Sequence, residues 1–204
     1  MQAAGLTVVI SLASIAIGLA IGMVVSAGTL SPRKAFSVPA KLFVSFFRGV
    51  PLLVQLLLIY NLLPVLGINV PGVVAAIVGL SLCSAAFQAE NLRGGFSSVP
   101  RGLLEAADMM GLSHGQQFRR IRAPLAFRLT LPALLNEIIL TLKASSLVSV
   151  VGVVELTRRA QDLASTTFQP LQLFTAAGFL YLAINWIVAT TGGFWERKWS
   201  TRTR

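Results

Sequence analysis

The feature that most constrains this chain is a set of long apolar runs without charged residues. The first extends from Gly5 to Leu30 and the last from Leu171 to Phe194, and neither contains Asp, Glu, Lys or Arg. A helix crosses the hydrocarbon core of a bilayer with about 20 apolar residues, because each residue adds roughly 1.5 Å. Each run is long enough to cross, so the sequence predicts a helical membrane protein.

Composition supports this prediction. Of the 204 residues, 55% are apolar and 12% are charged, whereas a soluble domain carries about 25% charged residues to wet its surface. The net charge of +10 would suggest a nucleic-acid partner if the basic residues formed one patch. They flank the apolar runs instead, which is typical of membrane proteins, so we expect no nucleic-acid binding.

We therefore expect an all-α fold with five transmembrane helices in a single membrane domain that covers residues 1–204. The predicted spans are residues 5–30, 50–66, 72–89, 129–154 and 171–194. A basic loop connects the first two spans, and a long polar segment separates the third from the fourth. The first run is too long for the core of a signal peptide, and we expect it to stay in the membrane.

The distribution of basic residues orients these spans. Fourteen of the 17 lie in the loop after the first span, the segment after the third span and the C-terminal tail. Because Lys and Arg accumulate in cytoplasmic loops, we expect the N-terminus outside and the C-terminus in the cytoplasm. Residues 155–170 would then lie on the outer side.

Signatures of enzymes are absent from the sequence. No glycine-rich loop ends in Lys-Ser or Lys-Thr, so the chain has no phosphate cradle for ATP. His114 and Cys83 are the single histidine and the single cysteine, which excludes a His/Cys metal cluster. We expect no cofactor, no metal and no catalytic residues, and any ATP hydrolysis would belong to another chain.

The polar segment at residues 98–124 predicts a docking element on the cytoplasmic side. Pro100 is suited to the start of a helix, and Gly111 to the position after its end, where a positive φ is needed. Ser113 and Gln116 have the spacing of a capping box that opens a second helix, which we expect Pro124 to end. The residues alone do not identify the partner that docks there.

The same segment resembles a known signature. Glu105-Ala106-Ala107, then Gly111, Ile121 and Pro124 at fixed spacing, is similar to the cytoplasmic EAA motif of ATP-binding-cassette import permeases. Ala123 stands where that motif usually has Leu. Further segments resemble the polar-amino-acid subfamily of histidine, glutamine and arginine importers: Phe47 to Gln55, Ala89 to Gly95, Ser98 to Pro100, Asn136-Glu137 and Lys143 to Leu147.

This resemblance implies a fold, a function and partners. The fold would be that of type I importer permeases such as the methionine permease. The chain would be the inner-membrane subunit through which a polar amino acid or opine passes by alternating access. A cytosolic ATPase dimer would drive it, a periplasmic substrate-binding protein would supply it, and a second permease subunit, identical or homologous, would complete it. The coupling residues would be Glu105, Ala106, Ala107, Gly111, Ile121 and Pro124.

Glu137 lies about eight residues, roughly 12 Å, inside the fourth predicted span, where an unpaired carboxylate is energetically costly. Thr141 and Ala144 share its helix face at i+4 and i+7. Lys143 is rotated by roughly 120° from Glu137 and is a poor partner for it, so we expect a cationic substrate. With the resemblance, the expected substrate-binding residues are Glu137, Thr141, Ala144, Ser145 and Gln88.

Two other classes of protein are alternatives. A single-chain secondary transporter or channel would need more polar groups along its pore and inverted repeats, and the sequence has neither. A structural membrane scaffold would give no reason for the docking pattern. Which amino acid is carried, and whether the partner permease is an identical chain, stay open at this level.

Overall fold

The structure is a computed structural model that describes residues 2–200, and throughout that range helices are joined by short turns, with no strand. The all-α expectation is confirmed. The elements in chain order are α1 (Gln2–Thr29), α2 (Lys34–Gly49), α3 (Leu52–Val65), α4 (Gly72–Ser97), α5 (Arg101–Met109), α6 (His114–Gln117), a π-helical turn η1 (Phe118–Arg122), α7 (Ala123–Ala144), a 3₁₀ turn η2 (Ser145–Val151), α8 (Leu156–Thr167) and α9 (Pro170–Ser200).

Four helical stretches of the described chain are long and apolar enough to cross a membrane. They are Gln2–Thr29, Gly72–Ser97, His114–Val151 and Pro170–Phe194, and they contain four of the five predicted spans almost entirely. A fifth span arises if α2 and α3 count as one helix that is broken and bent by 104°.

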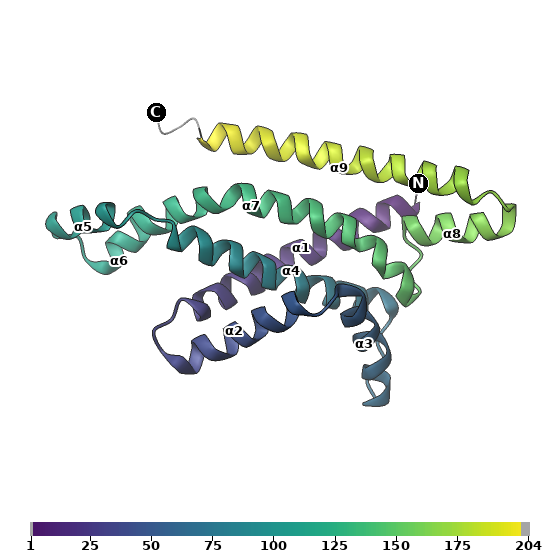
Figure 1. Ribbon diagram of the computed structural model, residues 1–204, viewed down its shortest axis with the longest axis horizontal. Helices are drawn as coiled ribbons and strands as arrows, with labels where there is room; N and C mark the ends of the chain where they lie inside the picture. Colours follow the sequence, from purple (N-terminus) through teal and green to yellow (C-terminus); the bar gives the residue numbers. More distant parts are fainter. Residues whose placement is uncertain (1, 201–204) are drawn as a thin grey trace.

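The second predicted span, residues 50–66, is therefore only half of a broken element. The preceding residues, expected as a basic loop, form α2, which runs back beside α1 before α3 leaves at a steep angle (Figure 1). Pro51 causes the break, because proline favours an extended residue before it, and Val50 has φ −92° and ψ 132°. With 14 residues, α3 is about 21 Å long and too short to cross alone.

The close pairing of α1 with α4 forms the centre of the fold. A stripe of small residues on α1 is buried, and its glycines face α4: Thr7, Ser11, Ser14, Gly18, Gly22 and Ser26. A Cβ atom added to Gly22 would lie 3.0 Å from the Ala85 carbonyl oxygen, so the two backbones approach as closely as a glycine allows. Helix α7 packs against the other side of α4, and α9 lies at the edge of the bundle beside α7 and α8 (Figure 1).

The helix after the capping box continues where an end was expected. Pro124 lies in the first turn of α7, and the helical stretch runs without interruption from His114 to Val151. The π-helical turn η1 directly precedes this proline and accommodates its missing N–H group. The expectation that Pro124 ends the second short helix is therefore wrong, and α6 continues through η1 into α7.

Candidate functional site

A cavity of about 350 Å³ opens where α2 ends and α3 begins, against α4 and α7. Its volume lies in the range of small-molecule binding sites. Most of its wall is apolar, with Phe47, Leu80, Phe87 and Leu140 among the lining residues. The charged residues of the described wall are one cation, Arg48, and one anion, Glu137.

The break between α2 and α3 forms one side of this cavity. The buried side chain of Gln55 lies inside the bend, where its Nε2 donates to the carbonyl oxygens of Phe47 at 3.0 Å and Val50 at 2.8 Å. These bonds provide donors to two carbonyls at the end of α2, and the Cys83 thiol also donates to the Phe47 carbonyl at 3.8 Å. The N-terminus of α3, at Pro51 and Leu52, also faces the cavity and contributes a partial positive charge there.

Glu137 projects from α7 and is 6% exposed. The Thr141 hydroxyl lies 3.2 Å from Glu137 Oε1 and 3.3 Å from the Ser84 hydroxyl, so it can donate to the carboxylate while it accepts from Ser84. Among the side chains that the structure describes, no lysine or arginine forms an ion pair with Glu137. Lys143 is exposed elsewhere on α7, as its rotation predicts.

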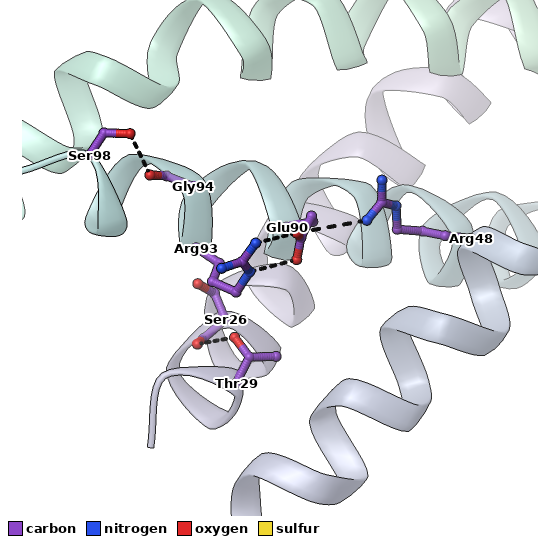
Figure 2. Close-up of polar contacts among 7 residues, drawn as sticks. All are labelled: Ser26, Thr29, Arg48, Glu90, Arg93, Gly94 and Ser98. Carbon is purple, nitrogen blue, oxygen red and sulfur yellow. Dashed lines mark hydrogen bonds and ion pairs between the residues drawn. The ribbon is translucent and has the colours of Figure 1, made fainter. Parts of the chain in front are cut away.

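Arg48 lies in the last turn of α2 and also lines the cavity. Its guanidinium lies 5.3 Å from the centre of the Phe87 ring, and its Nη1 lies 3.9 Å from Glu90 Oε1 (Figure 2). Arg48 was not among the residues expected to bind substrate, so its place on the cavity wall was not predicted. Its position three residues before Pro51 was the available signal, since a broken helix exposes the side chains of its last turn.

Of the five residues expected to bind substrate, Glu137, Thr141 and Ala144 line the cavity, and two lie behind its wall. Gln88 is buried towards α1, where its Nε2 donates to the Ile15 carbonyl at 3.3 Å and to the Ser84 hydroxyl at 2.8 Å. The fully buried Ser145 hydroxyl donates to the Leu142 carbonyl at 2.7 Å. Direct contact with a substrate stays a prediction for all five.

Ten of the residues that line the cavity were not predicted to line a site, among them Arg48, Cys83, Ser84 and Phe87. Together with Leu80, the three on α4 follow a helical spacing of three and four residues, which puts them on one face. Neither that face nor the face that packs on α1 contains a charged residue. The sequence pattern therefore does not show which of the two borders a cavity.

The docking element has the local structure that the sequence predicts. Gly111 has φ 72°, and the N–H groups of Leu112 and Gly111 bond to the carbonyls of Ala107 at 3.1 Å and Asp108 at 2.9 Å, the Schellman pattern at the end of α5. Ser113 and Gln116 form the capping box in both directions. The Gln117 amide then ties α6 back to α5 through Asp108 Oδ1 at 2.5 Å.

The residues expected to couple to an ATPase lie on α5, in the Gly111 turn, in η1 and in the first turn of α7, and α5 and α6 project beyond the other helices at one end of the molecule (Figure 1). Glu105 and Ala106 are exposed on α5, and Ala107 is fully buried against the turn that follows. Beside them Met109 is 91% exposed and Met110 is 68% exposed. Exposed methionines are frequent on surfaces that bind other proteins, so the docking function of this element stays a prediction.

Comparison with known proteins matches residues 6–200 of this chain to the family described as binding-protein-dependent transport system inner membrane component. The arginine transport system permease protein ArtQ of Bacillus subtilis is 35% identical, over 97% of this chain and 91% of its own length. The octopine transport system permease protein OccM of Rhizobium meliloti is 37% identical, over 91% of this chain and 80% of its own.

Two solved structures share the fold. A crystal structure of an amino acid ABC transporter with histidines superposes with a TM-score of 0.92 at 33% identity, covering 97% of this chain and 92% of that one. The inward-facing methionine transporter MetNI superposes with a TM-score of 0.81 at 21% identity, covering 97% and 94%. The expected type I importer-permease fold is confirmed.

Proposed function

Because the chain belongs to the family of binding-protein-dependent transport system inner membrane components, we propose that it carries amino acids or opines with a positively charged group. Membership makes the chain a multi-pass inner-membrane subunit of an ATP-binding-cassette importer, whose ATPase is a separate chain. The secondary-transporter, channel and scaffold alternatives are thereby set aside.

The unpaired Glu137 carboxylate carries this proposal. A buried carboxylate needs a compensating charge or several hydrogen bonds, and the described side chains supply the Thr141 and Ser84 hydroxyls but no ion pair. An ammonium or guanidinium group of a substrate in the cavity would supply the missing charge. The ArtQ and OccM relatives, whose names specify arginine and octopine, support a substrate of this class.

The opposite wall fits the other end of an amino acid. Arg48 and the N-terminus of α3 both favour negative charge, and both face the same cavity as Glu137. A substrate would place its cationic group at Glu137 and its carboxylate at Arg48. Ala144, on the same face of α7, is uncharged, so Glu137 is the one anionic side chain of the described cavity wall.

The docking element gives the coupling mechanism. Glu105, Ala106 and the exposed methionines would bind a groove of the ATPase subunit, and the Gly111 turn would hold α5 at a fixed angle. The continuous stretch from His114 to Val151 joins that turn to the α7 wall, which contains Glu137. A movement of the ATPases would therefore reach the cavity through one helix.

Partners and orientation complete the proposal. The transporter would contain an ATPase dimer, a second permease subunit, identical or homologous, and a periplasmic substrate-binding protein. The N-terminus would lie outside and the C-terminus in the cytoplasm. The gathering of α5, α6 and the basic end of α9 at one end of the bundle, opposite α8, supports that orientation (Figure 1).

Equilibrium binding tests the substrate class. The purified transporter, assembled with its ATPase and permease partners, is titrated with L-arginine, L-lysine, L-histidine, octopine and L-glutamate. The periplasmic substrate-binding protein is left out, because it has a selectivity of its own. We expect the cationic ligands to bind and Glu137→Gln to weaken the best of them about tenfold or more, since a charged hydrogen bond contributes roughly 1.5–3 kcal/mol. Asp162→Asn, on the surface of α8, is the matched control.

Two results would contradict the proposal. Unchanged affinity in a stably folded Glu137→Gln transporter would remove Glu137 from the substrate site. A variant that loses thermal stability but keeps the wild-type order of preference would make Glu137 a structural group that pairs with another chain of the assembly.

A further inference from the structure

A second carboxylate, Glu90, lies just outside the cavity between two arginines. Figure 2 shows Arg93 and Arg48 approaching it from opposite sides, one from its own helix and the other from the end of α2. Arg93 Nε donates to Glu90 Oε2 at 2.8 Å, and Arg93 Nη2 donates to Oε1 at 2.5 Å. Arg48 Nη1 is 3.9 Å from the same Oε1, beyond hydrogen-bond distance.

Glu90, Arg93 and Arg48 together carry one negative and two positive charges. A bidentate arginine–carboxylate pair uses both oxygens of the carboxylate, so Glu90 is satisfied by Arg93. Within this group, Arg48 is therefore the arginine that has no hydrogen bond to a carboxylate. Arg48 is also the member that reaches the cavity wall, over the ring of Phe87.

We propose that Arg93 is a positioning residue for substrate recognition: it occupies Glu90 and thereby leaves Arg48 available to bind the substrate carboxylate. The inference rests on the proposed function, because it needs a substrate with a carboxylate in the cavity. It goes beyond that function by assigning a task to two residues that do not line the cavity themselves.

The physical reason is competition between two carboxylates for one guanidinium. Without Arg93, Glu90 loses its hydrogen-bond donors and keeps its charge next to Arg48. A movement of about 1 Å would bring Arg48 Nη1 from 3.9 Å to hydrogen-bond distance, which side-chain rotation allows. The substrate carboxylate would then have to displace Glu90, and its affinity would fall. The cationic end of the substrate, at Glu137, would be unaffected.

The alternative is that Glu90 and Arg93 only stabilise α4 as an i, i+3 pair. Both side chains are partly exposed, 28% and 41%, and such pairs contribute little to stability. A purely structural pair would alter the binding of every ligand equally or of none. The proposal instead requires that only ligands with a carboxylate respond.

The test uses pairs of ligands that differ in the carboxylate alone, L-arginine with agmatine and L-lysine with cadaverine. Binding of each ligand to the assembled, purified transporter is measured at equilibrium, without the substrate-binding protein. We expect Arg93→Gln to weaken binding of the amino acid about two- to fivefold, the range typical of a partly exposed ion pair, and to leave the amine unchanged. Glu90→Gln/Arg93→Gln should restore the affinity for the amino acid, because the competing charge is gone. Arg128→Gln, an exposed arginine on α7 outside this group, is the charge-matched control.

Three results would overturn the inference: Arg93→Gln binds the amino acid as the wild type does, it weakens the amine to the same extent, or the double variant stays weak. A wild-type transporter that binds no cationic amino acid would instead refute the proposed function, so the two failures are distinguishable.

Discussion

Substitution of Gly111 tests the docking element through the backbone alone. Its φ of 72° lies in the left-handed region, and a Cβ atom added there would meet no heavy atom within 4 Å. Within this chain, the effect of an added side chain is therefore conformational and not a clash. This region costs a residue with a Cβ atom roughly 1–2 kcal/mol, with a higher cost for a β-branched residue and the lowest for Asn. A cost of 1–2 kcal/mol changes the population of the turn by a factor of about 5–30.

We therefore expect coupling to decrease in the order Gly, Asn, Ala, Val at position 111. The assay measures ATP hydrolysis by the transporter and its ATPase in reconstituted vesicles, stimulated by the substrate-binding protein and substrate. Substrate binding should be the same in all four proteins, since the cavity is distant from the turn. If Gly111→Val matches the wild type, the turn is not needed for coupling. If Asn and Val are equally impaired, side-chain size matters and the conformational argument fails.

Two further predictions concern packing and orientation. Gly22→Ile should lower the melting temperature of the purified transporter, because its Cβ atom would lie 3.0 Å from the Ala85 carbonyl and overpacking costs about 1–3 kcal/mol. The control is Ala20→Ile, at an exposed position of the same helix, which should leave the melting temperature unchanged. Equal melting temperatures of the two variants would contradict the close contact between α1 and α4. In a Cys83→Ser background, an impermeant thiol reagent added to intact cells should label Ser165→Cys and not Gly115→Cys, and the reverse pattern would refute the proposed orientation.

The sequence predicts those parts of the fold that depend on local chemistry. Uncharged runs predict α1 and α9, since a long apolar segment has few alternatives to a membrane helix. The turn at Gly111 and the capping box of Ser113 depend on residues within a few positions, and the structure contains both. Glu137 is recognisable because a carboxylate inside a span needs a partner.

The sequence does not predict features that depend on contacts between distant segments. Lys41 and Arg48 made residues 31–49 resemble a loop, but α2 packs against α1 and α4 and exposes its charges along one side. The place of Gln88 behind the cavity wall was not predictable for a similar reason. Helix α4 has one face on α1 and another on the cavity, and Gln88 lies on the face towards α1. The prediction that Pro124 ends a helix was wrong because the π-helical turn that accommodates this proline has no sequence signal of its own.

The most direct test of the central claim is a cryo-EM structure of the assembled transporter with L-arginine bound in the membrane subunits. The account predicts ligand density in the cavity between the α2–α3 break, α4 and α7, with the cationic group within hydrogen-bond distance of the Glu137 carboxylate and the ligand carboxylate at Arg48. Density elsewhere, or a ligand in this cavity with no contact to Glu137, would contradict it.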